Sequence, residues 1–325
     1  MNRAQQPLVS VVTPVYNGEK YLRECIESVL AQTYENFEFI IANNCSKDQT
    51  LAIAQSYAQL DPRIRVIDAT DFVGAIENSN RALTYMADDS AYCKILHADD
   101  WMYPECLEKM VSLADANPRV GVVGAYVLSG CKVRGDGLPY TDTVLSGRAT
   151  CKDRLQGGPY LFGSPSSILI RSDIVRSRVP FYPQDSLHVD VAVLFEILKD
   201  WDFGYVHQVL TYTRLHEESR TATIAQKLNT NRLEGLAMLT RYGPDFMTQA
   251  ELKQACDERL QLYYEELSRQ HIKLLDPAFR DFQRQSLENV GYPFSLLELV
   301  RAAARLTRGY IARPLRKLTG SAQSR

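Results

Sequence analysis

The chain has 325 residues, and a content of 45% hydrophobic and 23% charged residues is ordinary for a globular protein with one large or two smaller domains. Its formal net charge of -2 gives no reason to expect nucleic acid as the main partner. Seven cysteines lie scattered without a C-x-x-C pair, which argues against a disulfide framework or a zinc site and favours reduced thiols in a cytoplasmic protein. The first residues are too few and too polar for a signal peptide, and no apolar run is long enough to predict a membrane-spanning helix.

Strands and helices are predicted to alternate over residues 8–128. Residues 8–13, LVSVVT, are apolar on both faces, which is typical of a strand buried inside a parallel sheet. Apolar side chains between Tyr21 and Leu30 repeat at helical spacing. Ser46 and Gln49 are predicted to form a capping box that opens a helix ending near Ala58. Further strands are predicted at 37–42, 63–67, 91–96 and 120–128, and further helices at about 73–86 and from Pro104 onward.

This alternation predicts an α/β fold with a doubly wound, mostly parallel sheet. In such sheets ligands bind beyond the carboxyl ends of the strands. Polar clusters occupy three predicted strand ends, at 13–17, 43–46 and 97–100. Three such clusters in one sheet indicate a ligand crevice.

The rest of the chain changes character in two steps. Residues 129–165 are rich in glycine and polar groups and are expected to be loops near the site. A strand at 168–170, a helix at 189–198 and a strand at 205–212 follow. Helical patterns then run to the end, so the expected division is a first domain over 1–220 and a helical C-terminal appendage over 221–325.

The last helical pattern is basic and amphipathic. Two interpretations stay open: a solvated helix and tail, or a surface anchor that makes peripheral contact with an anionic membrane. Its cationic residues are Arg301, Arg305, Arg308, Arg313, Arg316 and Lys317.

Two neighbouring carboxylates, Asp99 and Asp100, follow the predicted strand at 91–96. Adjacent like charges repel, so they form either a solvated turn or a site for something positive. A hard divalent cation such as Mg²⁺ or Mn²⁺ prefers carboxylate oxygen and commonly bridges protein to phosphate. Residue types alone do not decide between the two.

Four ordered motifs resemble family 2 glycosyltransferases of the GT-A fold over roughly residues 7–220: TPVYNGEKYLRECIESVLAQTY, NNCSKDQT, GAIENSNRAL and LHADDWMYP. Three later segments resemble the family as well: GSPSSILIR, HVDVAVLFEIL and TRLHEES. The resemblance implies transfer of a sugar from a nucleotide-diphosphate sugar to a carbohydrate or lipid-linked acceptor, with inversion at the anomeric carbon. It also implies a role in surface polysaccharide or glycolipid assembly.

The resemblance assigns roles position by position. Asp99 matches the last residue of the family's D-x-D motif, the expected ligand of Mg²⁺ or Mn²⁺, and His216 matches a possible second ligand. Asp190 matches the catalytic base, and if Asp190 is not the base, Asp185 and Glu196 are the nearest candidates. The residues expected to bind the donor are Thr13, Pro14, Tyr16, Asn43, Asn44, Asn80, Arg81, His97, Ala98 and Arg214.

Four positions depart from the family pattern. His97 replaces the first aspartate of the D-x-D motif, Asn43 and Asn44 replace acidic residues, and Val189 replaces a glutamate. These departures leave open a degenerate nucleotide-binding or scaffolding relative without transferase activity. A nucleotidyltransferase is disfavoured, because PVYNG is neither glycine-rich nor basic.

Several residues are expected to be structural despite their chemistry. Cys45 has no base paired with it, so inert packing is expected. His188 and His207 are interpreted as structural, and Trp101 and Tyr103 as packing against the helix that follows them.

Overall fold

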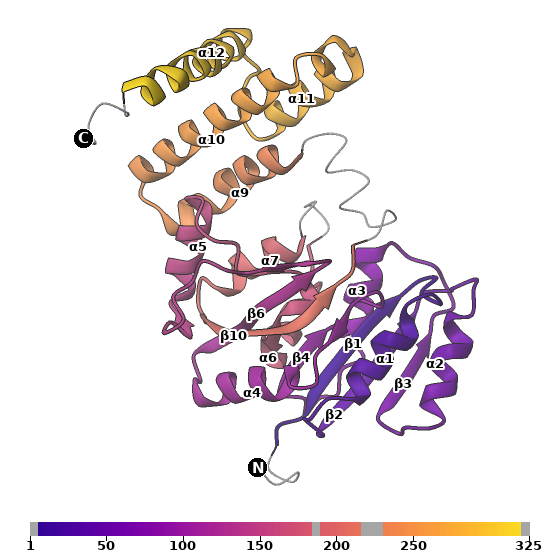
Figure 1. Cartoon of the computed structure of the whole chain (residues 1–325). Helices are drawn as coiled ribbons and strands as arrows, with labels where there is room; N and C mark the ends of the chain where they lie inside the picture. The colour runs from indigo at the N-terminus through magenta and orange to yellow at the C-terminus, as the bar shows by residue number, and fades with distance from the viewer. Residues whose placement is uncertain (1–5, 184–188, 216–229, 320–325) are drawn as a thin grey trace. The chain divides into compact units, whose positions relative to one another are not determined.

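The computed structural model describes residues 6–183, 189–215 and 230–319, with side chains omitted at 230–232 and 308–319. Its contacts divide the chain into two compact units, Met1–Leu215 and His216–Arg325. Figure 1 shows the α/β unit in indigo to pink and the helical unit in orange to yellow. The domain boundary expected from the sequence at 220/221 lies outside the described residues.

The α/β unit is built on one mixed, mostly parallel sheet with the strand order β3-β2-β1-β4-β9-β6-β10-β5. The strands of its parallel half are β1 (Val9–Val15), β2 (Phe37–Asn43), β3 (Ile64–Asp68) and β4 (Tyr92–Ile95). The parallel pair β6 (Val120–Ser129) and β10 (Asp202–Thr213) forms the other half. Short β9 (Leu169–Arg171) lies antiparallel between β4 and β6 and joins the halves. The two-residue β5 (Trp101–Met102) pairs antiparallel with β10.

Five helices of this unit agree with the helices expected from the sequence, whereas those at 147–155 and 172–176 were not expected. The helices of this unit are α1 (Leu22–Leu30), α2 (Thr50–Ala58), α3 (Ala75–Leu83), α4 (Cys106–Ala116), α5 (Gly147–Leu155), α6 (Ser172–Arg176) and α7 (Val189–Ile197). Apolar residues of α1 and α4 pack on β1, β2 and β6 in one buried cluster that includes Val11, Ile26, Phe39, Leu107 and Val123. This core holds the strand ends rigidly in place.

The capping box expected from Ser46 and Gln49 is wrong. Gln49 is the N-cap of α2 but makes no side-chain capping bond. The cap is supplied by Asp48, whose Oδ1 accepts the N–H of Thr50 at 3.0 Å. The Ser46 hydroxyl instead accepts the N–H of Asn17 at 2.9 Å, which ties the loop after β2 to the loop after β1.

Residues 129–165 are more ordered than their composition indicated. They contain β7 (Lys132–Arg134), which pairs with β6, and β8 (Val144–Leu145), which pairs with β10. They also contain α5, whose N-cap Ser146 accepts the N–H of Ala149. The helix was missed because its sequence, GRATCKDRL, has little apolar periodicity and is held by burial of Cys151 and Leu155.

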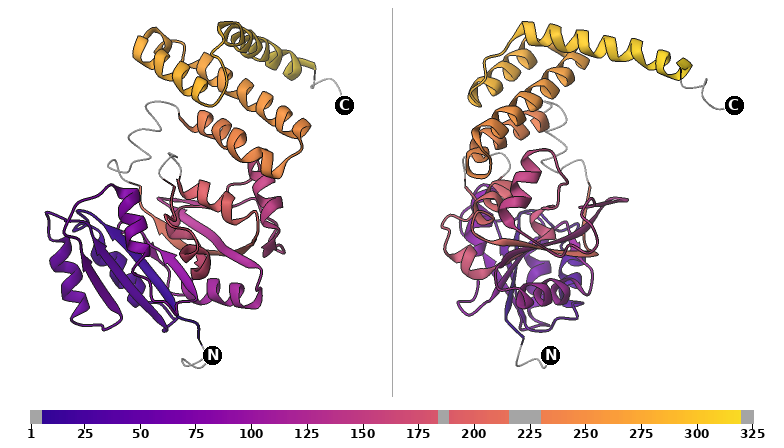
Figure 2. Two further views of the ribbon diagram at one scale, coloured as in Figure 1. Left: turned by 180° about the vertical axis from the view of Figure 1, so that it is seen from behind. Right: turned by 90° about the vertical axis from the view of Figure 1, so that its left-hand side faces the viewer.

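The helical unit contains α9 (Thr230–Phe246), α10 (Gln249–Arg269), α11 (Pro277–Asn289) and α12 (Leu296–Thr319). Buried Leu236, Tyr263, Leu267, Leu287 and Ala302 form its core. The right-hand view of Figure 2 shows that the second half of α12 extends beyond the other helices of this unit. Among the described residues, every helix is too short or too polar to cross a membrane.

Candidate functional site

The turn after β4 brings together three potential metal ligands. One ligand atom each from His97, Asp99 and Asp100 lies within 4.8 Å of the others. β4 ends at Ile95 in the middle of the sheet, so these side chains emerge at the carboxyl end of a buried strand. The expectation that this strand leads directly into the two aspartates is confirmed.

The two aspartates differ in environment. Asp100 is only 3% exposed, and its Oδ1 accepts the N–H of Arg214 at 3.0 Å. Burial raises the pKa of Asp100 and outweighs the lowering effects of His97, of a hydrogen bond from Ser166 and of the Arg214 N–H. Asp99 is half-buried. Buried Asp100 therefore stabilises the turn through its hydrogen bond with the Arg214 N–H, and Asp99 is the carboxylate closer to solvent.

Ser166 and Arg214 hold this turn from two sides. The Ser166 hydroxyl is fully buried and accepts the N–H of His97 at 3.1 Å. Arg214, just after β10, donates from Nε to the carbonyl oxygen of Asp99 at 3.2 Å and lies 4.3 Å from the centre of the Tyr21 ring. Its guanidinium also forms an ion pair with Glu24 of α1. The positively charged guanidinium of Arg214 is thus held in place beside the turn that carries Asp99 and Asp100.

The residues expected to bind the nucleoside lie at the ends of β1 and β2. Thr13 and Pro14 belong to β1, Thr13 fully buried and Pro14 half-buried. Tyr16 is 47% exposed, and its ring centre lies 4.8 Å from that of Phe72, which is 60% exposed. Phe72 was not identified from the sequence; a single aromatic residue in the polar stretch TDFVG after β3 was the available signal.

Asn43 and Asn44 are both 2% exposed and use their amides internally. Asn43 Nδ2 donates to Asp68 Oδ1 at 2.7 Å. Asn44 Nδ2 donates to the carbonyl of Val73 at 2.8 Å, and Asn44 Oδ1 accepts both the Val73 N–H and Arg81 Nη2. Asparagine suits these positions because its side chain both donates and accepts, which an ionised carboxylate cannot do.

Asn80 and Arg81 are neighbours on α3, but their side chains bond to different parts of the chain. Arg81 contacts Asn44 at 2.8 Å and forms a 3.2 Å ion pair with Asp71. Asn80 bonds instead to the backbone of Tyr182: Nδ2 donates to the Tyr182 carbonyl at 2.9 Å and Oδ1 accepts the Tyr182 N–H at 2.7 Å. The structure brings Arg81, but not Asn80, to the loops after β2 and β3.

Asp190 is half-buried in the first turn of α7, where the helix dipole stabilises a carboxylate. Burial, and then the negative charge of Asp190, raise the pKa of the buried Tyr182 phenol well above its usual value. Of the alternative bases, Glu196 forms a 2.8 Å ion pair with Lys199 near the other end of the helix. Asp185, His188 and the expected second metal ligand His216 lie outside the described residues.

The remaining candidates have structural surroundings. Ala98, between His97 and Asp99, packs against the main apolar cluster. His207 bonds through Nδ1 to the Tyr126 hydroxyl and through Nε2 to the Asp142 carbonyl, both at 2.9 Å.

Trp101 stacks on Tyr212 of β10 at 5.1 Å. Its neighbour Tyr103 packs against the same indole at 4.7 Å. Cys45 has a positive φ of 58° and its thiol donates to the Ala69 carbonyl at 3.1 Å.

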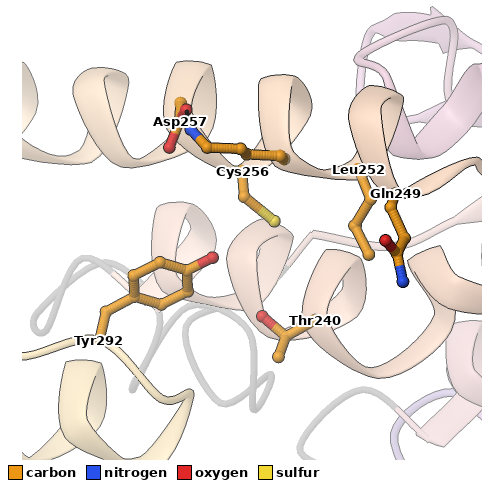
Figure 3. A pocket seen from close by; sticks show the side chains of 7 residues that line it. Thr240, Gln249, Leu252, Cys256, Asp257 and Tyr292 are labelled. Carbon is orange, nitrogen blue, oxygen red and sulfur yellow. Dashed lines mark hydrogen bonds and ion pairs between the residues drawn. The ribbon is translucent and has the colours of Figure 1, made fainter.

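A separate cavity of about 290 Å³ lies wholly within the helical unit. Figure 3 shows Cys256 of α10, Thr240 of α9 and Tyr292 pointing toward it. Its lining residues are Thr240, Gln249, Leu252, Lys253, Cys256, Asp257 and Tyr292. The sequence motifs contribute none of these residues.

Two curated relatives share part of this chain. An uncharacterized glycosyltransferase of Haemophilus influenzae is 36% identical over 121 residues, which are 37% of this chain and 37% of that protein. The putative teichuronic acid biosynthesis glycosyltransferase TuaG of Bacillus subtilis is 38% identical over 106 residues, 33% of this chain and 41% of that protein. The matched segments thus span well under two thirds of these relatives.

Solved structures are similar over much more of the chain. TarS 1-349 of S. aureus in complex with UDP has a TM-score of 0.61 at 18% identity, covering 87% of this chain and 79% of that one. The mannosyltransferase PcManGT of Pyrobaculum calidifontis, in complex with GDP-Man and Mn²⁺, has a TM-score of 0.53 at 14% identity, covering 93% and 88%. At these identities the likeness establishes the fold, which is the GT-A type expected from the sequence.

A family model described as glycosyl transferase family 2 matches residues 10–178, which include the loops after β1 and β2, α3, and the turn with His97, Asp99 and Asp100. The match covers more than half of the chain. With the fold and the arrangement of polar strand ends described above, it shows that the chain belongs to glycosyl transferase family 2.

Proposed function

We propose that this chain transfers a sugar from a nucleotide-diphosphate sugar to an acceptor hydroxyl with inversion at the anomeric carbon. The observation that carries the proposal is the cluster of His97, Asp99 and Asp100 at the end of β4, whose ligand atoms lie within 4.8 Å of one another. The cluster follows the carboxyl end of β4, and ligands of doubly wound sheets bind beyond this end of the strands. TarS and PcManGT, which share the fold, were solved with UDP and with GDP-Man.

The nucleoside has a matching surface at the ends of β1, β2 and β3. Tyr16 and Phe72 offer exposed aromatic rings 4.8 Å apart for a base to pack against. Arg81 contacts Asn44 and Asp71, the residue that precedes Phe72. Asn44 Oδ1 already accepts hydrogen bonds from Arg81 and from the Val73 N–H. Its role is therefore to hold these loops in place rather than to bind the base.

The donor set of the cluster fits a hard divalent cation, Mg²⁺ or Mn²⁺. Two carboxylates and an imidazole converge, and the buried carboxylate of Asp100 is fixed by the Arg214 N–H. Asp99, which is nearer to solvent, would be the main ligand, with His97 and Asp100 beside it. When bound, such a cation stabilises the charge that develops on the leaving diphosphate. Arg214 adds a positive charge fixed against Asp99 and Tyr21.

The acceptor needs a base, and Asp190 suits this role. In a single displacement the acceptor oxygen attacks the anomeric carbon, the bond from that carbon to the diphosphate oxygen breaks, and the hydroxyl proton passes to the Asp190 carboxylate. The diphosphate leaves with the bonding electron pair. One displacement with no covalent sugar–enzyme intermediate inverts the anomeric centre.

The setting we propose is the cytoplasmic face of a membrane in surface polysaccharide or glycolipid assembly, with a carbohydrate or lipid-linked acceptor. The putative role of TuaG in teichuronic acid biosynthesis supports this setting. The exposed Leu296, Leu297 and Val300 of α12 and the basic residues that follow them support peripheral contact with anionic lipid.

Screening the full chain against a panel of nucleotide sugars by thermal shift, with and without Mn²⁺, tests the proposal. We expect at least one donor to stabilise the chain only with the metal, and that donor to be hydrolysed or transferred. Asp99→Asn should abolish the metal-dependent shift and keep the melting temperature of the free protein. Metal-dependent binding without turnover would instead identify a degenerate nucleotide-binding relative. Unchanged metal dependence in the Asp99→Asn variant would show that Asp99 is not the ligand.

A further inference from the structure

Asn80 lies on α3 beside Arg81, yet its amide bonds to a segment 102 positions further along the chain. Its Nδ2 donates to the Tyr182 carbonyl at 2.9 Å, and its Oδ1 accepts the Tyr182 N–H at 2.7 Å. These reciprocal bonds satisfy both backbone groups of one residue outside any strand or helix. Asparagine is the shortest side chain that can donate and accept in this way.

Tyr182 connects this pair of bonds to Asp190. The Tyr182 side chain is 4% exposed and packs edge-on against Phe181 at 4.9 Å. Burial and then the charge of Asp190 raise the pKa of the Tyr182 phenol, so the carboxylate in the first turn of α7 is near enough to act on the phenol electrostatically. The backbone that Asn80 fixes therefore carries the phenol on which the charge of Asp190 acts.

We propose that Asn80 is a positioning residue that fixes the Tyr182 backbone and thereby the surroundings of Asp190. This inference rests on the proposed function, in which Asp190 takes the acceptor proton. Asn80 and Arg81 are consecutive, so one turn of α3 serves the donor side through Arg81 and the base side through Asn80. The sequence resemblance had grouped Asn80 with the donor-binding residues.

Two variants and a control test the proposal. Asn80→Ala removes both hydrogen bonds, whereas Asn80→Asp keeps the acceptor for the Tyr182 N–H but loses the donor to its carbonyl. Ser79→Ala is the matched control, because the Ser79 hydroxyl bonds within α3 to the Ala75 carbonyl at 2.9 Å. Each full-length variant is examined by amide hydrogen exchange at Tyr182, by donor binding and by steady-state kinetics.

In Asn80→Ala we expect exchange of the Tyr182 amide to accelerate about tenfold or more, since its acceptor is gone. We expect kcat to fall by about 10- to 100-fold with the KM for the donor within about twofold, because misplacing a catalytic group costs turnover more than binding. Asn80→Asp should keep slow exchange at Tyr182 and lose less turnover. Ser79→Ala should match the wild type in all three measurements.

Weakened donor binding with kcat retained would make Asn80 a donor ligand and overturn the inference. Faster exchange with both kinetic constants unchanged would also overturn it, since the bonds would then be structural only. A wild-type chain that transfers no sugar would refute the proposed function and the positioning role that depends on it. Exchange in Asn80→Ala would then still show whether Asn80 fixes Tyr182.

Discussion

Asp190 is the residue on which the proposed displacement depends. Asp190→Asn keeps the size and hydrogen-bonding reach of the side chain but cannot accept a proton at this step. We expect donor and metal to bind normally and kcat to fall by about 10²- to 10⁴-fold, the usual contribution of a general base. Equilibrium binding measures the affinity for donor and metal, and pre-steady-state kinetics measures the rate of the transfer step.

Glu196→Gln is the matched control for Asp190→Asn, because Glu196 belongs to the same helix but forms an ion pair with Lys199. It should leave kcat near the wild-type value. If Glu196→Gln abolished turnover and Asp190→Asn did not, Glu196 would be the base. Loss of donor affinity in Asp190→Asn with turnover kept would make Asp190 a binding residue.

Lys94 gives a second expectation at the scale of single residues. Its side chain is fully buried in β4, and Nζ donates to the Ile168 carbonyl at 3.1 Å. Burial lowers the pKa of Lys94 from its usual value of 10.5. The unfolded chain therefore holds the Lys94 proton more tightly than the folded chain, and the contribution of Lys94 to the free energy of unfolding should rise with pH between the lowered folded pKa and 10.5. Buried cysteines and tyrosines with raised pKa values, such as Cys93 and Tyr92, act in the opposite direction, so the Lys94 contribution is read as the difference between wild type and variant.

Urea unfolding as a function of alkaline pH measures this effect. Lys94→Met should remove the Lys94 contribution, which amounts to about 1.4 kcal/mol for each unit by which the pKa is lowered. Lys109→Met changes an exposed lysine on α4 and should leave the pH dependence of the wild type unchanged. A Lys94→Met variant with the same pH dependence as the wild type would contradict the assignment.

The sequence predicted where chemistry-bearing residues emerge but not what each of them touches. Asp99 and Asp100 could be placed at a strand end because an apolar run leads directly into them. The internal use of Asn44 by Val73 and Arg81, and the contact of Asn80 with Tyr182, join residues far apart in sequence. Such contacts follow from the packing of loops, for which a single sequence has no periodicity.

At the scale of elements, the start of α2 shows how a correct helix can have an incorrectly assigned cap. Asp48 accepts hydrogen bonds from the backbone N–H groups of Thr50 and Glu19, each at 3.0 Å. Burial acts to raise the pKa of Asp48, but hydrogen bonds from Thr50 and Glu19 outweigh it and lower that pKa. The carboxylate thus caps α2 and also ties it to the loop after β1.

Asp48→Ala should therefore destabilise the chain by about 1 kcal/mol, as loss of a helix cap usually does. Because the folded pKa of Asp48 is lowered, its contribution should be present at neutral pH and disappear as pH falls through that pKa. Urea unfolding at neutral and acidic pH measures both effects. Ser46→Ala is the comparison, and a larger loss there than in Asp48→Ala would restore Ser46 as the cap.

Among the elements that were not expected, α5, β7 and β8 have a common cause. Each is short or weakly patterned and gains its order from neighbours: β7 pairs with β6, β8 with β10, and α5 buries Cys151 and Leu155. Long strands such as β1, in contrast, carry enough β-branched apolar residues to be recognised alone. Tertiary contacts supply what local sequence lacks.

At the scale of the whole molecule, the proposed membrane contact depends on the exposed side of α12. Leu296, Leu297 and Val300 are 69%, 58% and 65% exposed, and Arg301 lies beside them with 57% of its side chain exposed. Further cationic residues follow in the sequence as far as Lys317. Deleting α12 would be a poor test, because Ala302 is fully buried and the Ser295 N–H bonds to the Tyr264 hydroxyl at 2.8 Å.

Substituting Leu297→Gln and Val300→Gln together removes apolar surface while keeping the buried side of α12. The intact chain should sediment with vesicles that contain phosphatidylglycerol and much less with pure phosphatidylcholine, and added salt should weaken the binding. The double variant should bind anionic vesicles about tenfold more weakly and keep transfer to a soluble acceptor.

The control is the double variant Ile272→Gln with Leu275→Gln. It changes two residues that are 71% and 78% exposed elsewhere in the helical unit, and it should bind vesicles like the wild type. Equal loss in both double variants, or no vesicle binding by the intact chain, would mean that α12 is a solvated amphipathic helix.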